Sequence, residues 1–394
     1  MTDLPSTMKA MVLTGHGGPE KLEYRTDVPV PAPAPGEVLI EVSACGMNNT
    51  DLKVREAAYA VDFDPNSGAE EEGAAASIAA ADGTTSLTFP RIQGADTVGR
   101  IVAVGDGVAA ARMGERVLVD FSLYHGRDAE GRPAMDLWNV DYIGHGRDGG
   151  YAEYVAVPAE NAHAIGREIE DAALATFGCS TLTAEHMLAR VDVRAGQYVL
   201  VTGASGGVGS AAVQLVRARG ALPIAVTSRS KEEALLALGA EACVARQDFE
   251  DADGRFDGRR FVDVVAEAAG GSYRVDAVVD QVGGTMFHSL LRCLKPDGHY
   301  ITAGTIAGYT PRINLHTVYM AFLNIHGSSQ GQPRDFARIV GHIEAGRIAP
   351  VLGGAFPLSR LHEAQEAFRR KSHIGNLVIV PDAKWEAVGQ AHAL

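Results

Sequence analysis

The residues with the clearest chemical potential form a glycine-rich turn between an apolar strand and a helix. Residues 199–216 read VLVTGASGGVGSAAVQLV, in which Gly206 and Gly209 occupy the second and third positions of a GxGxxG pattern and Ala204 the first. Small residues there allow a close approach to a pyrophosphate, and the amides at the helix start supply hydrogen-bond donors. The stretch therefore predicts a dinucleotide site built from residues Ala204, Ser205, Gly206, Gly207, Val208 and Gly209.

A second feature concerns the choice between NADPH and NADH. About 20 residues beyond the glycines, NAD enzymes place an acidic residue that binds the ribose 2′-hydroxyl. Here Ser228 holds that place, followed by Arg229, Ser230 and Lys231, and the first carboxylate is Glu232. Cations and hydroxyls suit a 2′-phosphate, so NADPH is the expected cofactor. The alternative is that Arg229 and Lys231 are ordinary solvated cations ahead of a helix.

The surrounding elements divide the chain into two kinds of pattern. In the first third, short Val-rich segments at 37–46, 98–105, 115–121 and 151–158 are typical of an antiparallel β domain. From residue 166 onward, helical stretches alternate with apolar strands at 198–204, 222–228, 243–246, 277–284 and 299–305, which indicates a doubly wound parallel sheet. The expected fold class is α/β, with a β-rich domain of residues 1–165 and 312–394 interrupted by a nucleotide-binding domain of residues 166–311.

The segment 61–88 differs from the rest of the chain. It is dominated by Ala, Gly, Ser, Asp and Glu and has too few large apolar residues to pack by itself. It is interpreted as a loop insertion. A tolerated surface loop, an active-site lid and an oligomer contact all remain open.

Composition limits the class of protein and its partners. The 394 residues suit two domains, and the formal net charge of −14 disfavours nucleic acid and anionic membranes as partners. Four widely spaced cysteines favour reduced thiols, and no apolar stretch is long enough for a membrane span. A cytoplasmic protein acting on a small molecule is expected.

Several further motifs resemble the medium-chain dehydrogenase/reductase superfamily, and within it the zinc-free quinone oxidoreductase and enoyl reductase branch. They include MKAMVLTGHGGPEKLEY at 8–24, FPRIQGADTVGRIVAVG at 89–105 and DGGYAEYVAVPA at 148–159. The resemblance implies a GroES-like catalytic domain, a Rossmann domain and a homodimer or homotetramer. It also implies weaker cofactor contacts at Thr183, Gly283, Gly304 and Ser328.

The resemblance allows the residues at the zinc-ligand positions of the superfamily to be compared with those of this chain. Matching to the alcohol dehydrogenase branch puts Asn48 and Ala95 at two of the three ligand positions, and only Cys179 keeps a ligand type. No metal site is therefore predicted. An unorthodox site from Cys45, Asp96, Cys179 and one of His125 or His145 is the alternative.

The stretch GMNNTDLKVREAAY, residues 46–59, resembles the corresponding pattern of quinone and enoyl reductases. It implies that Asn48, Asp51 and Tyr59 are catalytic candidates, with Asn48 and Tyr59 donating to a substrate carbonyl. Thr50 departs from this pattern and is a further candidate, because alcohol dehydrogenases use a hydroxyl at this position to relay a proton. Two structural alternatives are an ion pair between Asp51 and Arg55 at i,i+4 spacing and a packing role for Tyr59.

Together these features predict an NADPH-dependent oxidoreductase that transfers hydride to an activated C=C or a quinone without catalytic zinc. One alternative is an alcohol or polyol dehydrogenase of the same superfamily, possibly with an atypical zinc site. The other is a protein that binds NADPH without turnover.

Overall fold

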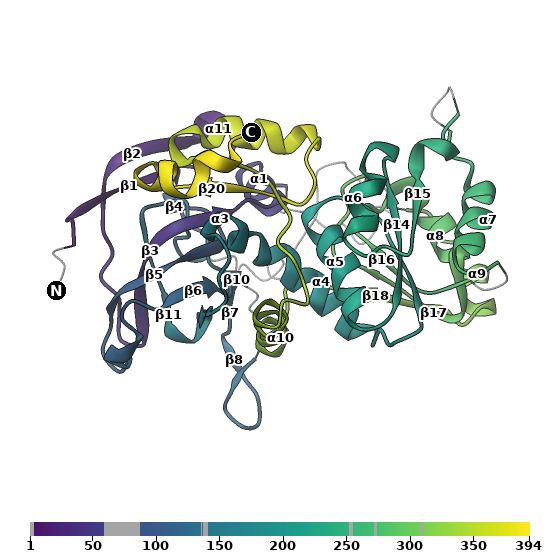
Figure 1. The fold of residues 1–394 in the computed structure, drawn as a ribbon, viewed down its shortest axis with the longest axis horizontal. Coiled ribbons are helices and arrows are strands. Elements are labelled where there is room, and N and C mark those ends of the chain that lie inside the picture. The colour runs from purple at the N-terminus through teal and green to yellow at the C-terminus, as the bar shows by residue number, and fades with distance from the viewer. Residues whose placement is uncertain are drawn as a thin grey trace, which may run out of the picture. The chain divides into compact units, whose positions relative to one another are not determined.

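The computed structural model describes residues 4–58, 87–134, 136, 141–251, 255–271, 274–308 and 311–394. The chain divides into two compact units, drawn in Figure 1. The first contains residues 1–179, 332–344 and 352–394, and the second contains residues 180–331 and 345–351.

The first unit is built on a mainly antiparallel sheet. Its strand order is β12-β6-β5-β3-β20-β19, and β11 also pairs with β3. The strands are β3 (Glu37–Gly46), β5 (Asp96–Val104), β6 (Arg116–Val119), β11 (Tyr154–Pro158), β12 (Ala162–Ala164), β19 (Leu352–Pro357) and β20 (Asn376–Val380). The β-rich pattern expected from sequence is confirmed.

The first unit also contains a second, smaller sheet. It has the order β2-β1-β4, formed by β1 (Thr7–Leu13), β2 (Leu22–Pro29) and β4 (Arg91–Ile92). Buried apolar residues of β1 join a core with residues of helix α11 (Leu361–Arg370), among them Leu361 and Phe368. Short helices α1 (Asn49–Arg55), α3 (Asp171–Leu174) and α10 (Pro333–Glu344) and the short strands β7 (Ser122–Leu123), β8 (Gly126–Arg127), β9 (Pro133–Ala134) and β10 (Asp141–Tyr142) complete the unit.

The second unit is a parallel sheet with the order β15-β14-β13-β16-β17-β18. Its strands are β13 (Tyr198–Val201), β14 (Leu222–Thr227), β15 (Ala242–Ala245), β16 (Val275–Asp280), β17 (Leu294–Thr302) and β18 (Asn324–Gly327). The helices are α5 (Gly207–Ala218), α6 (Glu232–Ala237), α7 (Gly258–Ala268), α8 (Phe287–Cys293) and α9 (Leu315–Met320), and α4 (Cys179–Arg190) leads into the unit. Helices lie on both faces of the sheet, so its central strands β13, β14 and β16 are mostly buried and rich in apolar residues (Figure 1). The predicted doubly wound fold is confirmed.

Three stretches lie in a different unit from the one expected: residues 312–331 and 345–351 lie in the second unit, and residues 166–179 lie in the first. Residues 312–331 belong with the parallel sheet, because β18 pairs with β17, with Tyr300 opposite Ile325. Residues 166–179 belong with the β-rich unit, where the Cys179 amide donates to Asp96. None of these placements could be predicted from the local sequence. The strand NIHG, for example, has little strand character of its own.

Candidate active site and nucleotide turn

In the first unit, the chain after β3 passes directly into α1 through Asn48. Asn48 is the extended residue that precedes the helix, and its backbone N–H donates to Asp51 Oδ2 over 2.8 Å. The hydroxyl of Tyr151 donates to the same Asp51 oxygen, also over 2.8 Å. These two hydrogen bonds to Asp51 fix the start of α1 and therefore the position of the Asn48 side chain.

The Asn48 amide is held from the other side by Asp96, the first residue of β5. Asn48 Nδ2 donates to Asp96 Oδ2 over 3.0 Å, and the Cys179 backbone N–H donates to Asp96 Oδ1 over 2.7 Å. Glycine is required here, because a Cβ on Gly178 would lie 2.3 Å from Asp96 Cγ. Since a primary amide has two N–H donors, Asp96 occupies one and leaves the other for a ligand.

Both carboxylates of this network are fully enclosed by protein. Burial raises the pKa of Asp96 to about 7, opposed by the hydrogen bonds from Asn48 and Cys179 and reinforced by the nearby charge of Asp51. Burial likewise raises the pKa of Asp51 to about 6, against hydrogen bonds that include those from Asn48 and Tyr151. The network therefore holds protons more tightly than exposed carboxylates do.

This shift predicts a specific pH dependence of stability. A carboxyl group whose pKa is higher in the folded state stabilises the fold fully below its unfolded pKa, and that stabilisation is lost as the pH rises through the folded value. The unfolding free energy of the wild-type protein should therefore fall by an additional 1 to 3 kcal/mol, roughly, relative to Asp96→Asn between about pH 5 and about pH 8. Urea titrations at both pH values measure this. Parallel pH profiles for the two proteins would show that Asp96 does not titrate in this range.

Two of the three zinc positions of the resembled branch hold Asn48 and Ala95, and two residues of the alternative site make other contacts. Asn48 is bonded to Asp96, Ala95 carries only a methyl group, and Cys45 is buried with its thiol directed at the Gly46 carbonyl. Among the described residues, no group of three or more His, Cys, Asp or Glu side chains is arranged to hold a metal ion. His145, an alternative ligand, contacts Asp141 over 3.0 Å.

Of the other catalytic candidates, Thr50 and Asp51 lie among the described residues and Tyr59 does not. Thr50 is half-buried in the first turn of α1. Asp51 and Arg55 do not form the alternative ion pair, because Arg55 donates to the Gly17 carbonyl and to Glu56. Tyr59 lies outside the described residues, as do residues 61–86 of the insertion.

The sequence did not predict a place in this hydrogen-bond network for Tyr151 or Asp96. Tyr151 belongs to the resembled segment 148–159, but its bond to Asp51 joins residues 100 positions apart. Asp96 was considered only as a metal ligand, whereas its contact with Asn48 indicates a positioning role. A buried Asp120 that accepts from the Tyr124 hydroxyl over 2.5 Å was also missed.

In the second unit, the glycine turn is tightly packed around Gly209 and open at the start of α5. Gly203 has a positive φ of 55°, and a Cβ on Gly209 would lie 2.3 Å from the Gly203 carbonyl oxygen. Gly206 precedes α5 and is exposed, and no side chain caps the first turn. The first-turn amides of a helix lack partners within the helix, so this end of α5 fits an anionic group.

The predicted 2′-phosphate residues follow β14 directly. Ser228 precedes a short 3-10 turn of residues Arg229–Lys231, and its hydroxyl lies 3.4 Å from that of Ser230. Arg229 is exposed but contacts Asp248, which lies just beyond β15. Burial lowers the pKa of the half-buried Lys231.

The weaker cofactor candidates lie on the same unit. Thr183 is half-buried on α4. Gly283 has a positive φ of 65°, immediately after the turn held by Asp280 at the end of β16. Gly304 and Ser328 follow β17 and β18, respectively. All three therefore follow carboxyl ends of parallel strands, where open α/β sheets bind ligands.

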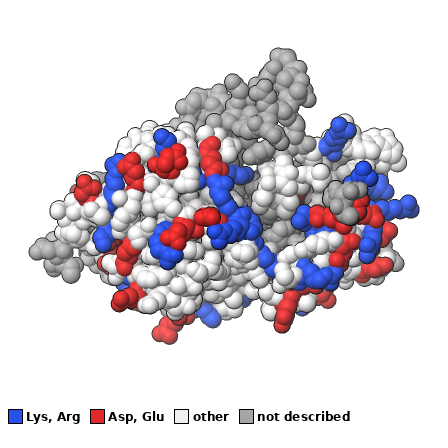
Figure 2. Space-filling view, turned by 90° about the horizontal axis from the view of Figure 1, so that it is seen from above, with Lys and Arg blue, Asp and Glu red and all other residues white. Residues whose placement is uncertain are grey.

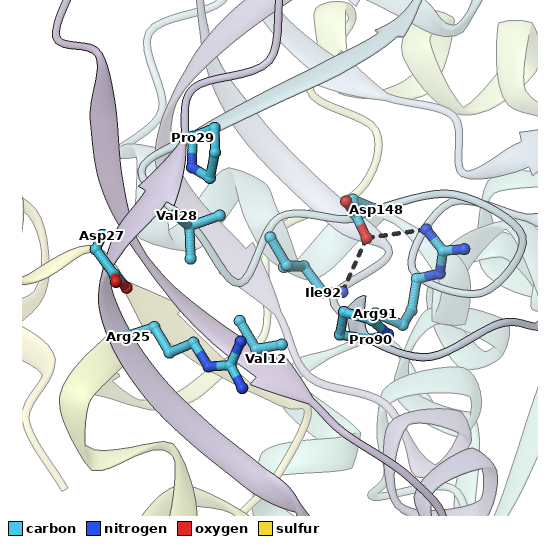
Figure 3. Close-up of a pocket in the computed structure, with 9 residues that line it drawn as sticks. All are labelled: Val12, Arg25, Asp27, Val28, Pro29, Pro90, Arg91, Ile92 and Asp148. Carbon is cyan, nitrogen blue, oxygen red and sulfur yellow. Dashed lines mark hydrogen bonds and ion pairs between the residues drawn. The ribbon is translucent and has the colours of Figure 1, made fainter.

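A shallow pocket elsewhere on the first unit contains none of these residues. Figure 3 shows its lining, with Arg91 bonded to Asp148 over 2.9 Å and Asp148 also accepting from the Ile92 amide. Arg91 and Asp148 therefore hold β4 against the loop that precedes β11.

The surface charge is not uniformly acidic. On the face in Figure 2, Lys and Arg side chains lie among Asp and Glu side chains. No helix in the described part of the chain is long and apolar enough to cross a membrane. All four cysteines are described, and none forms a disulfide.

Comparison with known proteins matches both units to families. Residues 34–167 match the alcohol dehydrogenase GroES-like domain and residues 207–345 match the zinc-binding dehydrogenase family. A structure from Sinorhizobium meliloti 1021, assigned as an alcohol dehydrogenase, is 53% identical over 97% of this chain and 99% of its own, with a TM-score of 0.87.

Curated relatives are more distant but cover nearly the whole chain. An NAD-dependent alcohol dehydrogenase of Sulfolobus acidocaldarius is 28% identical, covering 94% of this chain and 99% of its own. A quinone oxidoreductase of Rattus norvegicus is 27% identical, with 95% and 98% covered. An acryloyl-coenzyme A reductase of Metallosphaera sedula is 24% identical, with 94% and 99% covered. The chain therefore belongs to the medium-chain dehydrogenase/reductase superfamily and is an oxidoreductase of that type.

Proposed function

We propose that this oxidoreductase uses NADPH to reduce an activated C=C or a quinone without a catalytic zinc. The observation that carries the proposal is the Asn48 side chain, which lies where the alcohol dehydrogenase branch has a metal ligand. It is held by Asp96, which also accepts from the Cys179 amide. A neutral amide fixed by a buried carboxylate is a hydrogen-bond donor, which is what polarisation of a carbonyl requires in the absence of a Lewis acid.

The cofactor supplies the hydride when bound, and the chain supplies orientation and hydrogen bonds. In the proposed reaction, the second N–H of Asn48 donates to the substrate carbonyl oxygen and stabilises the negative charge that develops there. Asp96 keeps the amide from rotating, and Asp51 with Tyr151 keeps α1 in place. Thr50 and Tyr59 remain candidates to deliver the proton that completes the reduction.

NADPH is proposed over NADH because of the residues after β14. Ser228, Ser230 and Lys231 provide hydroxyls and a cation where NAD enzymes place a carboxylate, and Arg229 adds a second cation. The first turn of α5 is proposed to receive the pyrophosphate.

The test is a substrate panel followed by cofactor absorbance, combined with metal analysis of the purified protein. Reduction of enones, enoyl thioesters or quinones, faster with NADPH and insensitive to chelators, is the expected result. About one tightly bound zinc per chain, with activity lost on chelation, would overturn the zinc-free proposal. Turnover preferring NADH would overturn the cofactor assignment.

An alcohol or polyol dehydrogenase is the second candidate. It is favoured by the alcohol dehydrogenase assignments of the Sinorhizobium and Sulfolobus relatives and by the hydroxyl of Thr50. Oxidation of simple alcohols without enone or quinone reduction would select it. Binding of NADPH with no turnover on the whole panel would select the non-catalytic alternative.

We further propose that the chain forms a homodimer or homotetramer. Large apolar side chains are exposed beside the edge strand β18, namely Ile313, Leu315, Tyr319, Met320, Phe322 and Ile325. An exposed apolar patch beside an edge strand favours pairing with a second copy.

This assembly predicts that Phe322→Asp shifts the protein toward monomer, because Phe322 is 74% exposed and a charge there would be desolvated in an interface. Light scattering after size exclusion measures the change. Met113→Asp is the matched control, because it places the same charge on an exposed apolar residue of the first unit. A wild-type monomer would contradict the proposal.

A further inference from the structure

The carboxyl ends of β14 and β15 lie next to each other in the parallel sheet, with Thr227 opposite Ala245. Arg229 follows the first strand and Asp248 follows the second. Arg229 Nη2 lies 2.5 Å from both carboxylate oxygens of Asp248. An acidic side chain is therefore positioned on the cation that the proposed function assigns to the 2′-phosphate.

The two neighbouring arginine side chains do not compete with Arg229 for the Asp248 carboxylate. Arg260 donates to the Asp248 backbone carbonyl, not to its carboxylate, over 3.0 Å. Arg246 is paired with Glu250 over 2.8 Å. The Asp248 contact, followed by the weaker influence of Glu232, raises the pKa of Arg229. In the described part of this end of the sheet, the ion pair of the Asp248 carboxylate is the one with Arg229.

We infer that Asp248 is a specificity-determining residue that opposes the 2′-phosphate and keeps the preference for NADPH over NADH small. The inference rests on the proposed cofactor site. A phosphate dianion and a carboxylate compete for the same guanidinium donors and repel each other when both approach it. NADH has a hydroxyl at this position, so its binding does not meet that repulsion.

The expected size of the effect follows from exposure. The Arg229 and Asp248 side chains are 65% and 37% exposed, respectively. Exposed ion pairs contribute weakly because water and salt screen them. Removing the Asp248 charge should therefore improve discrimination in favour of the 2′-phosphate by roughly two- to fivefold.

The experiment uses two fragments, adenosine 2′,5′-bisphosphate and adenosine 5′-monophosphate, titrated calorimetrically into the full-length protein. The measured quantity is the ratio of their Kd values in wild type, Asp248→Asn, Arg229→Ala and Glu250→Gln. Glu250→Gln is the matched control, because it removes a charge from the same segment without touching Arg229.

The expected result is a two- to fivefold larger preference for the bisphosphate in Asp248→Asn, no change in Glu250→Gln and a loss of preference in Arg229→Ala. If Arg229→Ala loses the preference but Asp248→Asn leaves it unchanged or lowers it, this inference is overturned and the proposed cofactor site stands. If wild type, Arg229→Ala and Asp248→Asn all bind the two fragments equally well, both are overturned. Thermal melts of each variant check that the fold is retained.

Discussion

Asn48→Ala is expected to lower kcat for enone or quinone reduction by about 100-fold, because one oriented hydrogen-bond donor to a developing oxyanion contributes about that much. The effect should fall mainly on kcat, with KM changed little, since the bond strengthens as charge develops on the oxygen. Steady-state kinetics on the best substrate of the panel measures the split.

The adjacent exposed residue provides the control for this prediction. Asn49 accepts a hydrogen bond from Lys371 and makes no contact with Asp96, so Asn49→Ala should retain nearly full activity. Cofactor affinity should be the same in both variants and in wild type. An Asn48→Ala protein with normal kcat would rule out a role for this amide in the chemical step.

A second large effect is expected at the glycine turn. Gly206→Val should weaken NADPH binding by more than tenfold while leaving the melting temperature close to that of wild type. At Gly206 a Cβ would meet only the Gly203 carbonyl oxygen, at 3.5 Å, so the protein tolerates it, whereas a branched side chain would occupy the approach to the helix amides.

Gly209 should behave in the opposite way. A Cβ there would lie 2.3 Å from the Gly203 carbonyl oxygen and 2.6 Å from Ala204 Cα, so Gly209→Val should destabilise the unit itself. Melting curves and fluorescence titration with NADPH separate the two effects. If Gly206→Val bound NADPH normally, the pyrophosphate would have to lie elsewhere.

The glycine turn could be predicted from sequence because its requirements are local. A strand, a turn with small residues and a helix follow one another within residues 198–218, and the structure has them in that order. The alternation of strands and helices was equally informative, because βαβ connections restrict the sheet to a parallel, doubly wound form.

The partners of the candidate residues could not be predicted in this way. Asn48 and Asp96 are 48 positions apart and meet because β3 and β5 pair, with Gly46 opposite Asp96. The alternative ion pair between Asp51 and Arg55 had the right spacing, yet Asp51 accepts a hydrogen bond from Tyr151 and Arg55 has other partners. Helical spacing brings side chains within reach, but burial and the competing donors around them select the bond that forms.

The sequence by itself determined the fold class and the glycine-rich turn between a strand and a helix, because periodicity and glycine placement act over short stretches of chain. Tertiary structure decided which groups surround the chemistry. It placed Asp96 behind Asn48 and Asp248 on Arg229, in each case through strand pairing between segments distant in sequence. The electrostatics of a site depend on distance in space, and only the folded sheet sets that distance.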